Sequence, residues 1–371
     1  YLEIALLPEL GGRIYQVRYL PTGQDLLYNN RVIKPSPWGP PEQGWWLGVG
    51  GIEFALPVAE HGYLTAEPWA VAWTQRADGG VTATLRADEP SRGLQTWVEV
   101  TLLPGQAGFA LRPSLHNPGS QAQPAQWWVN ALVSPGSHGV GPSLRVLCPA
   151  SEVLVHSCGD EALPGEGQRM PWPLAGGRDL RLYGNWRDYL GFFSLDPSPG
   201  YMAVYDDATQ VGLVRTYPAE VARGAKFFGF GVGFEEEGAY TDDGSQYLEM
   251  WGGWTPTFWD DGTLDPGQTV SWEEHWFVLS GLGDITAAGP RGVLSARRDG
   301  EQLRVAVASR ERGHWQLVVM AGDREVLRQP FAVSPEAPFR QAYALDGAAG
   351  ADRLTVRVEA AGEDILRAML D

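Results

Sequence analysis

Residues 96–115 read TWVEVTLLPGQAGFALRPSL, two runs of β-branched, aromatic and aliphatic residues joined through a Pro-Gly turn. Such runs predict a pair of adjacent strands. Similar runs at 69–73 and 81–85 precede them, so strands recur at intervals of about 8–12 residues with Gly, Asp or Pro between them. The pattern continues through residues 127–133, 201–205, 212–217, 246–251 and 270–279. This arrangement is typical of an antiparallel β-sandwich or barrel.

Composition also favours an all-β fold. The 371 residues include 47 Gly and 28 Pro, spread throughout the chain, and both residue types interrupt long helices. No segment before residue 280 has a helical hydrophobic period as strong as the strand-like runs. A hydrophobic content of 44% with 20% charged residues is that of a folded globular protein.

The charge of the chain excludes two classes of partner. With 28 basic and 45 acidic residues the formal net charge is −17, which repels both nucleic acid and an anionic membrane surface. We also predict no membrane-spanning helix, because no run approaches 18 consecutive apolar residues. We expect a soluble protein, either cytoplasmic or secreted after removal of a leader, and the oligomeric state is open. Cys148 and Cys158 form either one disulfide or two free thiols.

Composition changes near residues 281–290. Beyond this stretch aromatic residues become rare, and strand-like runs follow at 303–308, 315–320 and 354–359. Such a stretch fits a small immunoglobulin-like or fibronectin-like sandwich. We therefore predict a large β domain over residues 1–283 and a small β-sandwich over residues 284–371.

The segment from Lys34 to Gly51 is dense in Pro, Gly and Trp, and we predict a long loop without a regular element. Long ordered loops often carry function. The whole chain has 16 Trp, and indole rings stack well on the C–H faces of sugars while their N–H groups bond polar partners. We expect most of these rings to pack the core and the others to favour a surface that stacks on sugars.

The large domain resembles a known superfamily. His61-Gly62-Tyr63-Leu64-Thr65, followed by Pro68-Trp69 and by Trp127-Trp128-Val129-Asn130, is similar to the aldose 1-epimerase (galactose mutarotase-like) superfamily. Five stretches more closely resemble the uncharacterised domain family 5107 (DUF5107): Gly11–Ile14, Val32–Pro35, Gly50–Phe54, Trp127–Asn130 and Tyr247–Gly253. The resemblance covers roughly residues 1–280 and implies a large antiparallel β-supersandwich and a carbohydrate ligand. We expect the concave sheet face of this supersandwich, roofed by residues 35–51, to hold the ligand.

The resemblance also assigns two residues. His61 matches the sugar-binding histidine of the superfamily's first motif, and Glu249 stands where a late strand carries the catalytic glutamate. Two positions depart from the pattern: Thr65 replaces an arginine, and Asn130 or a neighbour replaces the second histidine. Interconversion of anomers needs a base for the anomeric hydroxyl and an acid for the ring oxygen. Without the second histidine the acid must be another residue, or the activity is absent.

Glu53 lies between two apolar residues at the end of the Trp-rich segment. Burial beside Trp45 and Trp46 would raise its pKa and keep it protonated, as an acid catalyst requires. A strand that pointed Glu53 at solvent would leave it without a role.

Glu60 and His61 are adjacent, so on a strand they would face opposite sides, and only one, His61 by the resemblance, would line the site. Glu249 alternates with Tyr247 and Trp251, which places an acid and two rings on one strand face. We therefore predict Glu249, His61 and Glu53 as catalytic residues. The predicted substrate-binding residues are Trp45, Trp46, Glu60, Asn130, Trp128, Lys226, Trp251 and Arg13.

These residues predict a protein that binds a sugar or glycoside and performs acid–base chemistry at its anomeric centre, either glycoside hydrolysis or aldose anomer interconversion. A non-catalytic carbohydrate-binding module that has lost the acid is the alternative. We predict no metal or other cofactor, because the histidines lack metal-ligand spacing. Paired acids in turns are explained by solvation, with one Ca²⁺ ion as the alternative. These pairs are Asp206-Asp207, Asp242-Asp243 and Asp260-Asp261.

Overall fold

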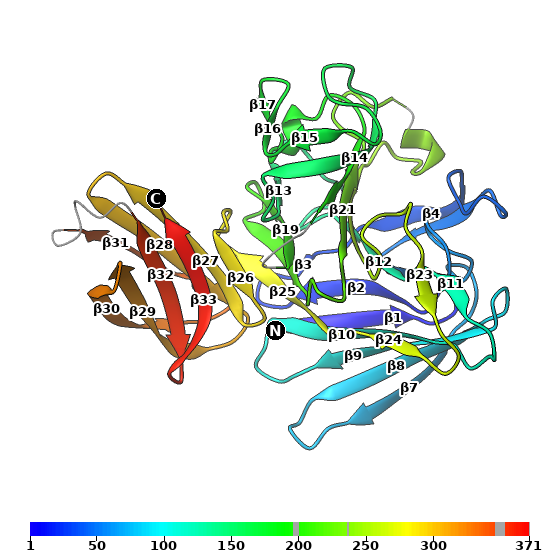
Figure 1. Ribbon diagram of the computed structural model, residues 1–371, viewed down its shortest axis with the longest axis horizontal. Coiled ribbons are helices and arrows are strands. Elements are labelled where there is room, and N and C mark those ends of the chain that lie inside the picture. The colour runs from blue at the N-terminus through cyan, green and yellow to red at the C-terminus, as the bar shows by residue number, and fades with distance from the viewer. Residues whose placement is uncertain (196–199, 236, 346–352, 371) are drawn as a thin grey trace.

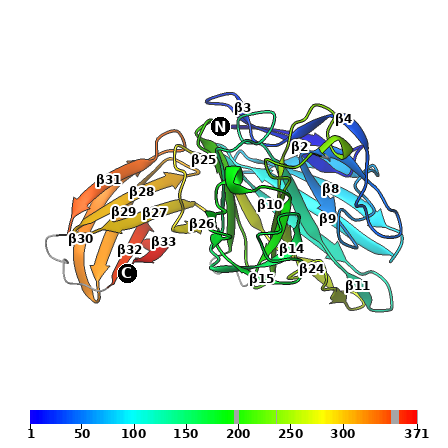
Figure 2. The ribbon, with the colours of Figure 1, turned by 90° about the horizontal axis from the view of Figure 1, so that it is seen from above.

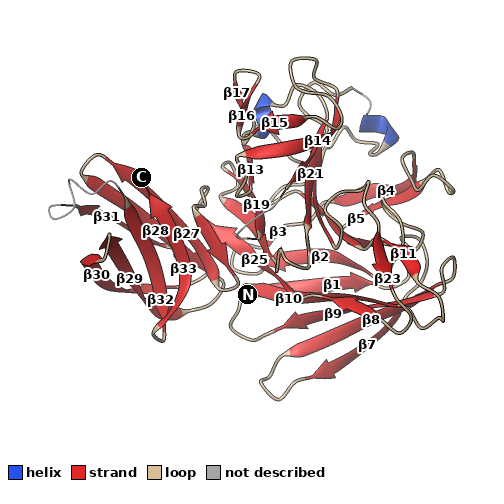
Figure 3. Cartoon of the chain, in the orientation of Figure 1, coloured by secondary structure: helices blue, strands red, loops and turns tan. Residues whose placement is uncertain are grey.

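The computed structural model confirms the all-β prediction (Figure 1). It describes residues 1–195, 200–235, 237–345 and 353–370, and strands dominate the regular structure (Figure 3). Two single-turn 3-10 helices, η1 (Tyr183–Asn185) and η2 (Glu237–Ala239), interrupt them. Among these residues no helix has the length and apolar character needed to cross a membrane. The strands form two large antiparallel sheets, two four-stranded sheets and three two-stranded ribbons.

One large sheet has ten strands in the order β1-β2-β6-β12-β22-β21-β18-β14-β15, with β3 beside β2. Its central strands come from distant parts of the sequence, so residues more than 100 positions apart become neighbours. The strands are β1 (Leu2–Leu7), β2 (Arg13–Tyr19), β3 (Gln24–Asp25), β6 (Ile52–Ala55), β12 (Trp128–Val133), β14 (Glu152–Cys158), β15 (Arg169–Pro171), β18 (Leu190–Ser194), β21 (Gly224–Gly229) and β22 (Leu248–Gly253).

The other large sheet has nine strands in the order β13-β19-β20-β25-β10-β9-β8-β7, with β24 beside β10. The hairpins expected from residues 81–115 form its β8, β9 and β10. Its strands are β7 (Ala70–Gln75), β8 (Val81–Glu89), β9 (Leu94–Leu102), β10 (Gly108–His116), β13 (Leu144–Leu147), β19 (Tyr201–Asp206), β20 (Val211–Thr216), β24 (Thr269–Ser271) and β25 (Glu274–Ser280).

The two large sheets pack face to face around one core. Alternate residues of the ten-stranded sheet enter this core, as Phe54 of β6, Val129 of β12 and Met250 of β22 do. Because side chains alternate along a strand, the residues between them project from the opposite face of the sheet. Ten of the 16 tryptophans are buried, as expected for a core rich in aromatic rings.

Strands after residue 286 build a further sandwich, whose sheets β26-β27-β28-β31 and β30-β29-β32-β33 enclose a core of their own. It docks on the outer face of the nine-stranded sheet, where Tyr205 and Phe277 pack with Val293 and Ala308 (Figure 2). Its strands are β26 (Ala287–Gly289), β27 (Gly292–Asp299), β28 (Gln302–Ser309), β29 (Gly313–Ala321), β30 (Arg324–Val333), β31 (Phe339–Ala344), β32 (Leu354–Ala360) and β33 (Glu363–Leu370).

The segment expected to be an irregular loop is partly regular, so that prediction is wrong. A two-stranded ribbon pairs β4 (Asn29–Ser36) with β5 (Trp46–Gly50), and residues 37–45 turn between them. A ribbon tolerates Pro35 because each strand has a free edge, where a missing N–H breaks no ladder bond. The run 270–279, expected as one strand, is divided between β24 and β25. The remaining ribbons pair β11 (Gln123–Ala125) with β23 (Gly262–Leu264), and β16 (Leu174–Ala175) with β17 (Arg178–Asp179).

Both cysteines are free thiols, which excludes the disulfide that the sequence left open. Burial raises the pKa of Cys148 to about 12. This thiol therefore stays protonated at neutral pH, and a protonated thiol is a poor nucleophile.

A buried ion pair lies between the two large sheets. Arg215 of β20 donates from Nε to Glu274 Oε2 of β25 at 2.7 Å, and its Nη2 bonds the same oxygen. Both side chains are fully buried, and Trp276 Nε1 donates to the other carboxylate oxygen at 3.0 Å. A Cβ at Gly252 of β22 would lie 1.9 Å from the Arg215 Cζ atom. Only glycine lets this guanidinium pass directly beneath β22.

We predict that Glu274→Gln lowers the free energy of unfolding by about 3–5 kcal/mol, because it leaves the Arg215 guanidinium buried without an anionic partner. Urea denaturation followed by tryptophan fluorescence measures the change. As a matched control, Glu325→Gln removes one of the two acidic partners of Arg328 at the surface and should leave the midpoint unchanged. Equal effects of the two substitutions would contradict the role of the buried pair.

Candidate functional site

One residue from each of five adjacent strands forms a row across the ten-stranded sheet. The register places Glu53 opposite Asn130, Asn130 opposite Trp251, Trp251 opposite Lys226, and Lys226 opposite Phe193. Directly opposed residues of antiparallel strands project to the same face of a sheet. Their neighbours along each strand enter the core between the large sheets. The row therefore lies on the face that is turned away from this core.

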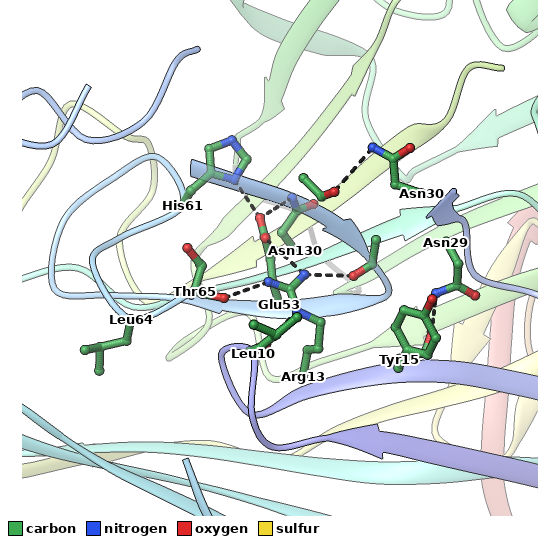
Figure 4. Close-up of polar contacts among 12 residues, drawn as sticks. Leu10, Arg13, Tyr15, Asn29, Asn30, Glu53, His61, Leu64, Thr65 and Asn130 are labelled. Atoms are coloured by element: carbon green, nitrogen blue, oxygen red, sulfur yellow. Dashed lines mark hydrogen bonds and ion pairs between the residues drawn. The ribbon is translucent and has the colours of Figure 1, made fainter. Parts of the chain in front are cut away.

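Glu53 of β6 is fully buried, and one of its oxygens accepts two hydrogen bonds (Figure 4). His61 Nδ1 donates to Oε1 at 2.6 Å, and Asn130 Nδ2 donates to the same atom at 2.9 Å. Arg13 Nη1 lies 3.6 Å from the other oxygen, Oε2. This arrangement excludes the solvent-facing alternative for Glu53, since three side chains occupy the place of water around its carboxylate.

His61 reaches Glu53 from a loop. Residues 56–62 leave β6 without forming a strand, and His61 has a φ of 48°, in the left-handed region that side chains rarely adopt. Its ring stacks on Trp46, with 4.0 Å between ring centroids and 5° between planes, and the edge of Trp251 lies at 5.1 Å. The imidazole is thus fixed with Nδ1 toward Glu53 and Nε2 on the far side of the ring (Figure 4).

The His61–Glu53 pair favours opposite charges on its two members. Burial alone would raise the pKa of Glu53, but the charge of His61 and the hydrogen bond from it outweigh burial, and this pKa is lowered. Burial alone would lower the pKa of His61, but Glu53 outweighs burial there, and this pKa is raised. The prediction that burial keeps Glu53 protonated is wrong, because His61, Arg13 and Asn130 stabilise the carboxylate.

The pKa of Glu249, on β22, is shifted in the opposite direction to that of Glu53. Glu249 is 5% exposed, and Trp251 Nε1 donates to its Oε2 at 2.7 Å. Burial raises the pKa of Glu249, although the charges of His61 and Lys226 act against this rise. The hydrogen bond confirms that Glu249 and Trp251 share one strand face, and Tyr247 packs on the same side of the sheet. A carboxyl group whose pKa is raised exchanges its proton more readily near neutral pH.

Lys226 of β21 is buried among aromatic rings. Its Nζ lies 4.2 Å from the ring centroid of Phe258 and 5.2 Å from that of Trp251. The nearest carboxylate oxygen among the described residues, Glu60 Oε2, is 4.0 Å away, an ion-pair distance that is too long for a hydrogen bond. Burial lowers the pKa of Lys226, and Glu60 and Glu249 oppose this change. Within the described chain Nζ makes no hydrogen bond, so its donors are available to a ligand.

Glu60 and His156 extend the row beyond β18. His156 sits where a bulge interrupts the pairing of β14 with β18, and its Nε2 lies 3.1 Å from Glu60 Oε1. Burial alone would raise the pKa of Glu60, but Lys226 and His156 outweigh burial and lower it to about 2. Burial and the charge of Lys226 lower the pKa of His156. The expectation that Glu60 and His61 face opposite sides of a strand is wrong, because both lie in a loop.

Four aromatic residues at this end of the row escaped the sequence analysis: His156, Phe193, Phe258 and Trp259. Phe258 meets the edges of Trp251 and Phe193 at 5.1 and 5.4 Å between centroids. Trp259 lies 5.7 Å from His156 and is 48% exposed. Two features of the sequence could have indicated these residues. Val153 and Val155 alternate in a strand-like run that leads to His156, and the aromatic pair Phe258-Trp259 follows β22.

The other predicted binding residues have different structural roles. Arg13 is buried and donates to three backbone carbonyls, so it supports the loop around Glu53. Trp128 is buried, packs on Phe258 at 4.7 Å and donates to Gln126 Oε1, which makes it a packing residue. Trp45 is 39% exposed, and among the described residues its ring forms no stacked or edge contact with another aromatic ring.

No three His, Cys, Asp or Glu side chains converge on a possible metal position in the described parts of the chain. The paired acids considered for Ca²⁺ bond protein donors: Arg145 with Asp207, Lys34 with Asp242, and Gln126 with Asp261.

Comparison with known proteins agrees with the resemblance seen in the sequence. The family described as "Domain of unknown function (DUF5107)" matches residues 1–277. A TPR-domain containing protein from Parabacteroides distasonis is 23% identical, with a TM-score of 0.67 over 76% of this chain and 46% of that chain. This chain therefore spans less than half of that protein.

Two further solved structures are similar at lower identity. A putative aldose 1-epimerase from Klebsiella pneumoniae is 14% identical, with a TM-score of 0.52 over 75% of this chain and 77% of that chain. A galactose mutarotase-like protein from Clostridium acetobutylicum is 12% identical, with a TM-score of 0.52 over 75% and 93%. At these identities the likeness concerns the fold, and it confirms the predicted mutarotase-like supersandwich.

The His61–Glu53 pair generates a direct prediction. Glu53→Gln removes the charge that stabilises the imidazolium, so the pKa of His61 should fall by about one unit or more. Histidine NMR titration measures this change. Asp243→Asn, which removes the partner of exposed His138, serves as the control and should leave the titration of His61 unchanged. An unaltered His61 titration in Glu53→Gln would contradict the assigned charges.

Proposed function

The chain belongs to the DUF5107 family, and from that premise and the geometry of the row we propose that it binds a reducing sugar and interconverts its anomers. The proposal rests on a proton acceptor and a proton donor that both contact Trp251. The acceptor is Glu249, a buried carboxyl with a raised pKa, and the donor is His61, whose pKa is raised by Glu53. Trp251 touches both, since it bonds Glu249 and meets the His61 ring. The names of two similar structures, a putative aldose 1-epimerase and a galactose mutarotase-like protein, support a sugar as the ligand.

In the proposed reaction Glu249 is the base and His61 is the acid. Glu249 takes the proton of the anomeric hydroxyl while His61 Nε2–H gives a proton to the ring oxygen. The bond between the anomeric carbon and the ring oxygen breaks, and the open-chain aldehyde forms. After rotation about the adjacent carbon–carbon bond, both proton transfers run in reverse and close the ring as the other anomer. The sugar is isomerised, and no other reactant is consumed.

Glycoside hydrolysis by Glu53 and Glu249 is less well supported. That reaction needs one protonated carboxyl as the acid and one ionised carboxyl. Glu249, whose pKa is raised, could supply the acid, but the ionised Glu53 is enclosed by His61, Asn130 and Arg13. Its oxygens are therefore poorly placed to attack a sugar or to activate a water molecule. Anomer interconversion does not require Glu53 to reach the sugar, because Glu249 and His61 carry out both proton transfers.

Unpartnered buried polar atoms beside the row also suit a sugar. Among the described residues, Asn130 Oδ1 and Trp46 Nε1 are buried without a hydrogen-bond partner. Buried polar groups are normally satisfied by protein, water or ligand. A hydroxyl group can donate to the former and accept from the latter, so hydroxyls of one ligand match both atoms.

A non-catalytic sugar-binding module is the second candidate, and Asn130 favours it. An amide does not titrate, so a chain with asparagine at this position has one proton-transfer group fewer than the superfamily pattern. The two candidates differ in whether the ligand is chemically changed.

We predict that Glu249→Gln slows anomer exchange at least about 100-fold, because it removes the proposed base. Proton NMR of freshly dissolved α-glucose and α-galactose follows the anomeric signals over time. Glu152→Gln, a matched change at an exposed position of β14, should leave the exchange rate as in the unmodified chain. Saturation transfer to the sugar without accelerated exchange would replace the catalytic proposal by the binding module.

The pKa directions also predict the pH dependence of the exchange rate. The rate should fall at low pH as Glu249 becomes protonated, at a pH above that of an ordinary glutamate because its pKa is raised. It should fall at high pH as His61 loses its proton. Lys226→Gln removes a cation that lowers the Glu249 pKa, so the acidic limb should move to higher pH. An acidic limb that stays in place would contradict the assignment of Glu249.

A further inference from the structure

The open end of the row carries a second arrangement suited to a sugar. We infer that Trp259, Glu60 and His156 form an additional subsite, so that the protein recognises a sugar of two or more residues. This inference rests on the proposed function and names the substrate class of the same site.

The exposure of the side chains indicates where a ligand enters. Glu53, His61 and Glu249 are 0%, 3% and 5% exposed, and Trp46 covers His61 from one side. The side chain of Glu60 is 28% exposed, and Trp259 is 48% exposed. A ligand whose reacting end lies beside His61 therefore extends toward Glu60 and Trp259.

Trp259 is held as a firm platform. Its ring lies 5.5 Å from Phe193 at 64° between planes and 5.7 Å from His156 at 34°. Phe258, its neighbour in sequence, meets the edges of both Phe193 and His156. An aromatic ring that is already fixed by its neighbours loses little freedom when a sugar stacks on it. Half of the indole surface stays open to receive such a ring.

Polar groups stand beside this platform. The Glu60 carboxylate pairs with His156 through Oε1 and lies 4.0 Å from Lys226 Nζ through Oε2. A carboxylate has about four acceptor positions, so it keeps capacity for sugar hydroxyls. Lys226 Nζ lies 4.0 Å from Glu60 Oε2 and 5.2 Å from the Trp251 ring centroid, and it makes no hydrogen bond within the described residues. It is placed to donate to an oxygen between two sugar rings.

Exposure of a tryptophan is not enough to make such a platform. Trp73 is 70% exposed, but it lies on β7, whose six residues are all exposed, at the edge of the nine-stranded sheet. In the described residues no ring contact fixes it, and it belongs to a different sheet from the row. Trp73 is therefore the matched control for Trp259.

The test compares glucose and galactose with the reducing disaccharides maltose, cellobiose and lactose. Affinity is measured by titration with saturation-transfer NMR on the full chain, alongside the anomer exchange rate. We expect at least one disaccharide to bind more tightly than either monosaccharide. Trp259→Ala should weaken that binding by about tenfold and leave monosaccharide exchange unchanged. Trp259→Phe should retain part of the affinity, and Trp73→Ala should retain all of it.

Each result separates the subsite from the reaction. Monosaccharide exchange that depends on Glu249, with equal disaccharide affinity in Trp259→Ala and the unmodified chain, would overturn the subsite and leave the proposed function standing. Disaccharide binding that Trp259→Ala weakens, without exchange of any sugar, would support the subsite and overturn the reaction. Absence of saturation transfer to all five sugars would overturn the subsite.

Discussion

The register of five antiparallel strands is the constraint on which the candidate site depends. Glu53, Asn130, Trp251, Lys226 and Phe193 meet only because β6, β12, β22, β21 and β18 pair without a slip. A shift of one residue in any of these strands would turn its member of the row into the core. The apolar residues that alternate with the row resist such a shift, since it would expose them. The same alternation that builds the core thus also fixes the polar groups on its outer face.

Different partners give the buried carboxyl groups in and beside the row different properties, although the groups are chemically alike. Glu53 is compensated by His61 and Asn130, and Glu60 by Lys226 and His156, so burial does not keep these two protonated. Glu249 has mainly the Trp251 N–H as a partner, and burial prevails. Environments that separate the pKa values of neighbouring acids are a common way to divide acid and base roles. Here the division leaves Glu249 as the carboxyl group best suited to exchange a proton.

The sequence predicted the fold better than the site, because strands are indicated by local sequence, whereas the site depends on contacts between distant residues. Strand-like runs such as 96–103 and 109–115 are local, and they became β9 and β10. The contact of Lys226 with Phe258, or of His156 with Glu60, depends on which strands pair and in which register, and spacing along the chain does not encode that. Local reasoning also failed where it assumed a strand: Glu60 and His61 lie in a loop, so alternation did not separate them. His156 sits at a bulge, where alternation is interrupted.

The departures from the superfamily pattern have a physical reading in this structure. Asn130 lies between Glu53 and Trp251 in the row and donates to Glu53, so the amide orients a carboxylate without adding a titrating group. Arg13, from a different strand, bonds the carbonyl oxygen of Thr65 and faces the same carboxylate, so a cation is present even though position 65 is not arginine. Both changes concentrate favourable contacts on Glu53, and Glu53 in turn raises the pKa of His61. In the proposed reaction His61 protonates the ring oxygen, so the contacts that Asn130 and Arg13 make with Glu53 act on the acid of the reaction.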